Sequence, residues 1–369
     1  MNNRPLKIGI QQRVLPSYRV PFFNMLAESY DRGVSVFYGT PRKAEMLNIN
    51  VIPEHAESFR GKNLHFFAGR FYLCWQAGLM KWMYAWNPDV LILEANPRYL
   101  SSKGAIRWMK RKKRKVIGWG LGSPLPQGVL SSLRLNQRRK FIRHFDALIT
   151  YSQQGADQYA ALGFPEERIF IAPNAVAGKP TCAAPKRPQK YDLNQAQVLF
   201  VGRLQSRKKV DVLIQACALL PDEMQPQLHI VGDGPARSEL VELTEKIYPK
   251  VKFYGAMHGE ELAALFKKAD LFVLPGTGGL AVQEAMSYAL PVIVGEADGT
   301  QSDLVRASNG WVLNSSDPQE LAGILSKALG DISKLRKMGA ASYAIVRDDI
   351  NLENMVAAFQ EAIEMLREK

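Results

Sequence analysis

The sequence predicts an α/β protein built from two doubly wound parallel sheets. Short apolar segments recur along the whole chain, and helical patterns of about 10–15 residues separate them. This alternation is typical of βαβ units, which assemble into parallel sheets. A length of 369 residues exceeds what one hydrophobic core usually covers, so we expect two domains rather than one.

The expected strands are more regular in the second half of the chain than in the first. In the second half they cover residues 198–201, 228–231, 251–254, 271–274 and 292–294, with helical patterns over 210–220, 236–247 and 259–269. In the first half the expected strands cover residues 6–10, 34–38, 90–93, 116–119, 147–150 and 169–171. Each half therefore supplies enough strands for a sheet of its own.

The domain boundaries follow from composition. We predict a Rossmann-like first domain over residues 1–180 and a linker over 181–196, where Pro, Lys, Gln and Ala replace any periodic pattern. A second Rossmann-like domain is expected over 197–347, and an amphipathic helix within 348–369. Ligands of doubly wound folds bind at the carboxyl ends of the strands, so we expect the two sheets to face each other across a cleft.

Cysteine spacing and hydropathy bear on the compartment. Cys74, Cys182 and Cys217 are widely separated and show no metal-ligand spacing, which favours a reducing compartment. The first ten residues have no signal-peptide pattern. No uncharged apolar run reaches the ~18 residues that a transmembrane helix needs. The expected location is the cytoplasm.

The net positive charge of the chain comes entirely from its first half. Residues 1–180 hold 27 Lys and Arg against 11 Asp and Glu, whereas residues 181–369 hold 21 against 24. The densest runs are Arg107 to Lys115 and Arg134 to Arg143. One interpretation is solvated helix faces; the other is attraction to an anionic surface. Large apolar residues accompany both runs, which favours a membrane over nucleic acid, for which we find no motif.

The segment from Pro275 to Val294 is the most informative part of the sequence. It reads as a strand end, a glycine-rich turn, a helix and the next strand. Gly278, Gly279 and Leu280 would present backbone N–H groups at the helix start, where a phosphate can bind. Glu284 lies about one and a half turns further along, where it can accept hydrogen bonds from a ribose diol. The segment therefore predicts a nucleotide-diphosphate site.

Two cations follow the expected strand 198–201. Arg203 and Lys208 lie in the loop after Gly202, where they can neutralise a diphosphate leaving group as its bond breaks. The alternative is a pair of surface cations at a helix start, a placement that the helix dipole disfavours.

Two more loops complete the expected sheet edge. Gly232 begins a Gly-Asp-Gly turn, which is a common turn pattern by itself. Ala256 and Met257 follow the next strand, where their backbone can face a base.

Taken together and in this order, these motifs resemble the second domain of family 4 glycosyltransferases, which have the GT-B fold. The matching motifs are Gly202-Arg-Leu with Lys208 and Asp211, the Gly232-Asp-Gly-Pro turn, Ala269-Asp270, Glu284-Ala-Met and Pro291-Val-Ile. The resemblance is close over residues 195–330 and looser in the first half, where Tyr18-Arg-Val-Pro-Phe-Phe and Pro173-Asn174 match.

The resemblance implies a role for each site residue. It assigns Arg203 and Lys208 to the donor diphosphate and Glu284 to the ribose hydroxyls. It assigns the N–H groups of Gly279 and Leu280 to a phosphate, and the backbone near Ala256 and Met257 to the base. It also implies a final helix that crosses back to the first domain. The chain contains no Asp-x-Asp motif, so we expect no metal cofactor.

Two positions depart from the family pattern. Gly276 stands where the family usually carries a second glutamate near the donor sugar, and Trp119-Gly-Leu-Gly122 stands where a histidine is expected. Glu94 is the best remaining carboxylate of the first domain. It can orient an acceptor hydroxyl, or it can simply act as a cap or pair with Arg98. The departures leave two hypotheses open, an active enzyme and a catalytically silent nucleotide-sugar-binding scaffold.

The expected function is that of a retaining, metal-independent hexosyltransferase. The donor would be a UDP- or GDP-sugar, and the acceptor a growing, lipid-linked cell-surface glycan. The basic first half would place the enzyme peripherally at the inner face of a membrane. The sequence leaves the donor base and sugar, the acceptor and the oligomeric state open.

Overall fold

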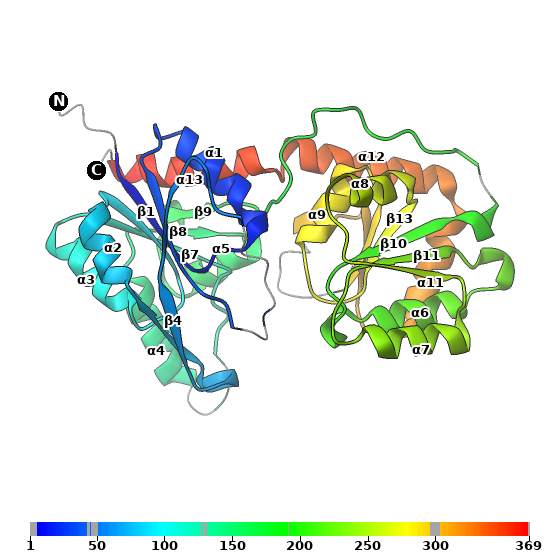
Figure 1. Cartoon of the computed structure of the whole chain (residues 1–369), viewed down its shortest axis with the longest axis horizontal. Helices are drawn as coiled ribbons and strands as arrows, with labels where there is room; N and C mark the ends of the chain where they lie inside the picture. The colour runs from blue at the N-terminus through cyan, green and yellow to red at the C-terminus, as the bar shows by residue number, and fades with distance from the viewer. Residues whose placement is uncertain are drawn as a thin grey trace. The chain divides into compact units, whose positions relative to one another are not determined.

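The computed structural model describes residues 6–42, 45, 51–126, 128, 131–190, 192–295 and 303–367. The chain divides into two compact units (Figure 1). Unit 1 contains residues up to Val176 together with Leu352 onward, and unit 2 contains Ala177–Asn351. The chain therefore leaves unit 1, completes unit 2, and returns to unit 1.

Unit 1 is built on a seven-stranded sheet in the order β3-β2-β1-β6-β7-β8-β9, with every pair parallel. Its strands are β1 (Ile8–Val14), β2 (Val34–Gly39), β3 (Glu57–Arg60), β6 (Val90–Glu94), β7 (Lys115–Gly120), β8 (Ala147–Thr150) and β9 (Ile169–Ile171). The order reverses direction between β1 and β6. In doubly wound sheets, ligands bind at the carboxyl ends of the strands at such a switch point.

The two faces of this sheet carry separate hydrophobic clusters. On one face lie α1 (Val20–Glu28) and α13 (Leu352–Arg367). On the other lie α2 (Leu79–Trp86), α3 (Ser102–Arg111), α4 (Ser131–Ile142) and α5 (Gln153–Ala161). An antiparallel hairpin, β4 (Lys62–Phe66) and β5 (Leu73–Ala77), stands apart from the main sheet. Helices on both faces confirm the doubly wound prediction for this half.

Helix α13 belongs to the core of unit 1 although it lies far away in sequence. The Phe359 ring centroid is 4.8 Å from that of Phe22 and 4.8 Å from that of Trp119. The buried Arg19 guanidinium donates to Asn174 Oδ1 at 2.7 Å and lies 5.4 Å from the Trp119 ring centroid. Trp119, in the segment where a histidine was expected, is thus a buried packing residue.

Unit 2 is built on a six-stranded parallel sheet in the order β12-β11-β10-β13-β14-β15. Its strands are β10 (Gln197–Val201), β11 (Gln227–Val231), β12 (Val251–Gly255), β13 (Leu271–Leu274), β14 (Val292–Gly295) and β15 (Gly310–Leu313). Its helices are α6 (Val210–Ala218), α7 (Arg237–Ile247), α8 (Gly259–Lys268), α9 (Leu280–Ser287), α11 (Pro318–Gly330) and α12 (Ile332–Asp348). Here the strand order reverses between β10 and β13.

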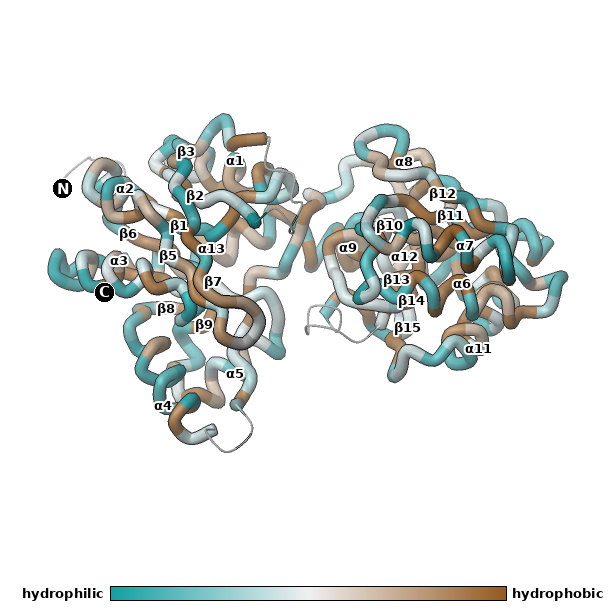
Figure 2. Tube along the Cα trace, turned by 60° about the horizontal axis from the view of Figure 1, so that its bottom comes forward, coloured by the Kyte–Doolittle hydropathy of each residue, from teal (hydrophilic) through white to brown (hydrophobic). Residues whose placement is uncertain are grey.

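The core of each unit sits on its sheet. Figure 2 shows hydrophobic residues concentrated along the central strands of both sheets. Every strand predicted from the sequence is present; the structure adds β3, β15 and the hairpin. None of the described helices is long and apolar enough to cross a membrane.

Candidate functional site

The predicted donor-site residues gather at the carboxyl edge of the unit 2 sheet, around the switch point between β10 and β13. Backbone hydrogen bonds tie the loops of this edge together. Gly202 N donates to Val231 O at 3.0 Å, and Thr277 N donates to Arg207 O at 3.1 Å. The loops after β10, β11 and β13 therefore form one connected rim.

Lys208 spans the switch point. It ends a short 3-10 helix, and Lys209 after it adopts a left-handed conformation with φ of 55° before α6 begins. The half-buried Lys208 side chain reaches across to the loop after β13, where its ammonium donates to Thr277 O at 2.5 Å. The cation is thus held at the entrance of α9.

Two glycines in the loop after β13 leave room for this lysine. A Cβ atom on Gly278 would lie 2.4 Å from Lys208 Nζ, and its φ of 141° disfavours other residues. A Cβ atom on Gly276 would lie 2.2 Å from Arg207 O and 2.6 Å from Lys208 Cα. Both contacts of Gly276 are with backbone atoms, which cannot easily move aside. This loop therefore has no space for the glutamate that the family usually carries there.

Arg203 and the remaining loops continue the rim. Arg203 follows Gly202 and is half-buried. Gly232, with φ of 136°, lies so close to the end of β10 that a Cβ atom would be 1.9 Å from Gly202 O, and its N–H donates to Gly255 O at 2.7 Å. Ala256 and Met257 directly follow Gly255, the last residue of β12. The structure therefore brings the predicted base, phosphate and leaving-group residues to consecutive strand ends.

Leu280 is the first residue of helix α9, and Gly279 is its N-cap. The first N–H groups of a helix lack partners within the helix and carry partial positive charge, so they favour an anion. Glu284 lies one turn inside α9, and burial raises the pKa of its carboxyl. A desolvated carboxylate binds hydroxyl donors strongly because water competes less.

The structure reveals two residues that fix α9 in place and that the sequence analysis missed. Gln283 is fully buried; it accepts a hydrogen bond from Ala177 N at 3.0 Å and donates to Ile350 O at 3.1 Å. Arg187, in the expected linker, donates to four carbonyl oxygens at the ends of α8 and α9: those of Phe266, Ala269, Tyr288 and Ala289, at 2.6–3.2 Å.

Burial, followed by the nearby Arg336, lowers the pKa of Arg187 to about 10. No sequence motif marks either Gln283 or Arg187, because their partners are backbone atoms.

Glu94 lies in unit 1, at the switch point of the other sheet. Its carboxylate accepts from Arg13 N at 3.0 Å, and its own N–H donates to Gln11 Oε1 at 3.1 Å. Burial raises the pKa of this carboxyl above the ordinary range, while hydrogen bonds oppose the shift. The Arg13 side chain pairs instead with Glu45 at 3.0 Å. Glu94 is therefore a fixed carboxyl group at the edge where ligands of such sheets bind.

The donor-side rim combines two cations, a helix N-terminus and a half-buried carboxylate, which together suit a nucleoside diphosphate. Within the described residues, no group of three or more His, Cys, Asp or Glu is arranged to hold a metal ion.

Comparison with known proteins identifies the family of the chain. The model described as "Glycosyl transferases group 1" matches residues 184–344, and the model described as "Glycosyltransferase Family 4" matches residues 23–177. Together they cover both units. The protein is thus of the glycosyltransferase class. It belongs to glycosyltransferase family 4, as the resemblance of its motifs predicted.

Curated relatives match parts of the chain. A "GDP-mannose-dependent alpha-mannosyltransferase" of Corynebacterium glutamicum is 38% identical over 152 residues, which cover 40% of this chain and 35% of the relative. A "D-inositol 3-phosphate glycosyltransferase" of Xylanimonas cellulosilytica is 24% identical over 293 residues, which cover 74% of this chain and 66% of the relative. The matched part is therefore between about a third and two thirds of each relative's length.

Solved structures match over nearly the whole chain. Anabaena HepE in complex with UDP-glucose has a TM-score of 0.69 at 18% identity, covering 99% of this chain and 100% of that one. WaaG, a glycosyltransferase of lipopolysaccharide biosynthesis, has a TM-score of 0.59 at 19% identity, covering 95% and 98%. These likenesses confirm the predicted GT-B fold.

Proposed function

We propose that the protein is a retaining glycosyltransferase that moves a hexose from a UDP- or GDP-sugar to a growing, lipid-linked glycan. The observation that carries the proposal is the Lys208 ammonium held against Thr277 O at the entrance of α9. Arg203 lies in the same loop as Lys208, and the half-buried Glu284 lies on α9. Such an arrangement stabilises charge where a sugar–phosphate bond breaks.

The donor is bound by unit 2. The diphosphate lies against Arg203, Lys208 and the N–H groups of Gly279 and Leu280, and Glu284 accepts the ribose hydroxyls. The backbone at Gly232, Ala256 and Met257 contacts the base. The relative named for GDP-mannose and the solved structure with UDP-glucose support a nucleotide-sugar, and they leave both bases open.

The transfer needs no protein nucleophile in this proposal. The bond from the anomeric carbon to the phosphate oxygen breaks, the acceptor hydroxyl oxygen bonds to that carbon on the same face, and the hydroxyl proton passes to the departing phosphate oxygen. The protein's part is leaving-group stabilisation by Arg203, Lys208 and α9, with no metal ion. The loss of the family glutamate at Gly276 is tolerated because this route depends on the phosphate contacts.

The acceptor is bound by unit 1, at the inner face of a membrane. The cation-rich runs on and after α3 and on α4 support attraction to anionic lipid. Glu94, a half-buried carboxyl at the switch point of the unit 1 sheet, orients the acceptor hydroxyl.

The second candidate is a nucleotide-sugar-binding scaffold without turnover, and Gly276 favours it. Two measurements separate the candidates. Thermal stabilisation by UDP or GDP tests the nucleotide site, since a ligand that binds only the folded state raises the melting temperature. Release of UDP or GDP from a panel of nucleotide-sugars with membrane lipid extract tests turnover. Stabilisation without release would favour the scaffold, and no shift with either nucleotide would remove both candidates.

A further inference from the structure

The β4–β5 hairpin of unit 1 has polar side chains on its inner face and apolar side chains on its outer face. Leu64 pairs with Trp75, and Phe66 pairs with Leu73. Leu64 is 38% exposed, Phe66 44% and Trp75 45%. A strand that merely covers a core shows the opposite alternation, with apolar side chains inside. The outer face of this hairpin is thus apolar surface that the described part of the protein leaves open to solvent.

The inner face explains why the hairpin keeps this orientation. Gln76 and Asn63 are buried; Gln76 Nε2 donates to Asn63 Oδ1 at 3.0 Å, and Asn63 Nδ2 donates to Arg13 O at 2.7 Å and to Thr40 O at 2.9 Å. A shift of the strands by one residue would bury Leu64 and Trp75 but would leave these amides without their partners. The polar contacts therefore fix the apolar face outward.

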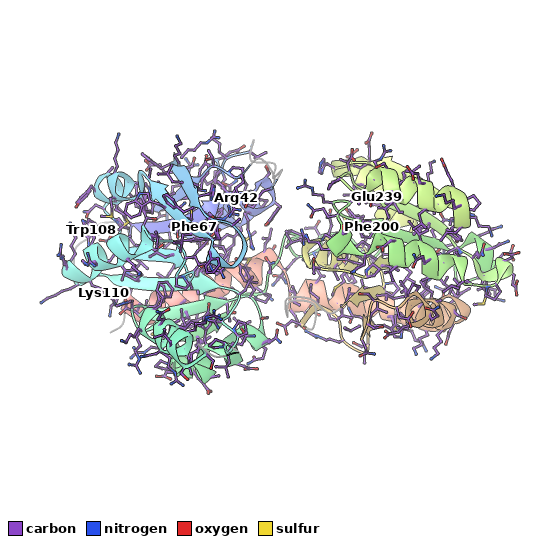
Figure 3. All side chains as sticks on the ribbon, turned by 90° about the horizontal axis from the view of Figure 1, so that it is seen from below. Arg42, Phe67, Trp108, Lys110, Phe200 and Glu239 are labelled. Carbon is purple, nitrogen blue, oxygen red and sulfur yellow. The ribbon has the colours of Figure 1, made fainter. Side chains whose placement is uncertain are left out.

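The hairpin tip adds two more exposed aromatic side chains. Phe67 is 74% exposed (Figure 3) and Phe71 is 65% exposed. Phe67 has a φ of 60°, an unfavourable conformation for a bulky residue. Together with Tyr72, Leu73 and Arg98 they line a hollow of about 660 Å³. The tip is therefore a projecting aromatic surface with a cation at its base.

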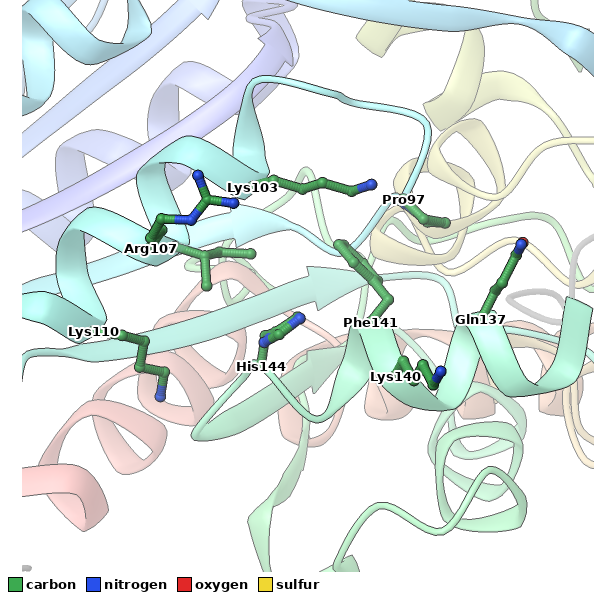
Figure 4. A pocket seen from close by; sticks show the side chains of 9 residues that line it. Pro97, Lys103, Arg107, Lys110, Gln137, Lys140, Phe141 and His144 are labelled. Carbon is green, nitrogen blue, oxygen red and sulfur yellow. The ribbon is translucent and has the colours of Figure 1, made fainter.

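Cations from α3 and α4 line a neighbouring hollow of unit 1. Burial, and then Arg134 and Arg98, lower the pKa of Arg138, so α4 lies within electrostatic reach of the hairpin hollow. Pro97, which precedes Arg98, lines a second hollow of about 640 Å³ between α3 and α4. Figure 4 shows Lys103, Arg107, Lys140 and His144 around the Phe141 ring. Aromatic and cationic surfaces thus adjoin on unit 1.

We propose that this face of unit 1 docks on an anionic lipid surface, with Phe66, Phe67 and Phe71 inserted at the boundary between headgroups and acyl chains. The cations of α3 and α4 bind the lipid phosphates. Phe and Leu side chains offer no hydrogen bonds to a glycan, whereas apolar side chains beside Lys and Arg match the interface of an anionic bilayer. The inference rests on the membrane location in the proposed function, and it names the element that enters the lipid.

Co-sedimentation with vesicles tests the insertion. The full chain is mixed with vesicles of phosphatidylcholine alone and of phosphatidylcholine with phosphatidylglycerol. The double variant Phe67→Ser/Phe71→Ser is compared with Leu219→Ser, which removes a 53% exposed leucine from unit 2. We expect binding to the anionic vesicles, a loss of about tenfold or more in the double variant, and no change in the control. A double variant that binds as tightly as the unchanged protein would overturn the inference.

Trp75 reports depth independently. Its emission should shift to the blue on anionic vesicles and should be quenched by lipids brominated in the acyl chains; the Trp75→Phe variant corrects for the other tryptophans. Unquenched emission would show that the hairpin stays in water and would refute insertion. If instead the double variant keeps vesicle binding but raises KM for a soluble acceptor glycan, the face binds sugar and the inference is wrong.

The nucleotide measurements keep this inference separate from the proposed function. Thermal stabilisation by UDP or GDP reports on unit 2, and Phe67→Ser/Phe71→Ser should leave it unchanged. Vesicle insertion without any nucleotide response would support the hairpin and refute the donor site. A nucleotide response together with vesicle binding that survives the double variant would refute the hairpin insertion and leave the donor site supported.

Discussion

The Lys208 ammonium donates to the carbonyl oxygen of Thr277 at 2.5 Å, across the switch point of the unit 2 sheet. This hydrogen bond joins the loop after β10 to the loop that opens α9. The lysine therefore has a fixed position before any ligand arrives, and in the proposed reaction little reorganisation would accompany charge development on the leaving group.

Replacement of Lys208 by Ala should lower turnover by about 10²-fold, because one charge partner of the leaving group is lost. Arg203→Ala should act in the same direction. Release of nucleotide from the preferred donor measures both. Lys246→Ala is the control, since Lys246 is an exposed cation in the last turn of α7. Unchanged turnover in both site variants would remove the diphosphate assignment.

Replacement of Gly276 by Glu, which restores the usual family residue, should damage the protein rather than activate it. The new side chain would overlap the backbone of Arg207 and Lys208, and overpacking of this kind costs about 1–3 kcal/mol. Chemical denaturation measures the loss. Gly323→Ala in α11 is the control, since its Cβ atom would meet open space. A Gly276→Glu variant that is stable and faster would show that the loop adapts easily.

Glu284 should make nucleotide binding sensitive to pH. Burial raises the pKa of this carboxyl above the ordinary value of about 4.3 for Glu. As the pH falls, Glu284 therefore takes up its proton at a higher pH than an exposed Glu would. The protonated form accepts ribose hydroxyls poorly, so affinity should fall through this window. Calorimetric titration with the nucleotide at several pH values checks the slope. Glu284→Gln should bind more weakly at neutral pH and show no slope; a slope that persists in this variant would assign the effect to another group.

The same variant has a second, opposite effect on stability. Because the folded pKa lies above the unfolded value, the proton is bound more tightly in the folded state. Stability from this group is present at low pH and is lost as pH rises through the folded pKa. Glu284→Gln should therefore unfold at the same or a higher denaturant concentration at neutral pH. Weaker ligand binding combined with a lower midpoint would indicate a structural role instead.

Arg187 should be essential for the stability of unit 2. Arg187→Ala leaves carbonyl oxygens at the ends of α8 and α9 without their donor, and we expect a loss of about 3 kcal/mol. Arg187→Lys should recover only part of it, because an ammonium lacks the planar fork. Lys190→Ala, an exposed neighbour, is the control. Urea denaturation compares the three variants, and equal midpoints for Arg187→Ala and Lys190→Ala would contradict the assignment.

The sequence predicts the core strands well because they are short apolar runs between helical patterns. It misses β3 because Glu57-Ser-Phe-Arg60 is largely polar, as an edge strand can be. It misses the β4–β5 hairpin because the buried positions there hold polar side chains and the exposed positions hold apolar ones. The sequence pattern therefore does not mark which face is buried.

The candidate donor site was predictable in its parts, since glycine turns, cations and Glu284 each follow an expected strand. Its tight packing was not, because the contact of Gly276 with the backbone of residues 207 and 208 joins segments almost 70 positions apart. For the same reason Arg187 looks like an ordinary linker residue. Its partners are carbonyl oxygens, which every residue has, so nothing in the sequence distinguishes them.

Helix α13 also has a consequence for how the protein is made. Phe359 fills the space between Phe22 and Trp119, so the core of unit 1 is incomplete until residues 352–367 have left the ribosome. Unit 2, a continuous segment, can finish folding earlier during translation. Through that interval α1 alone would cover this apolar face of the sheet, so part of it would stay exposed on the nascent first half.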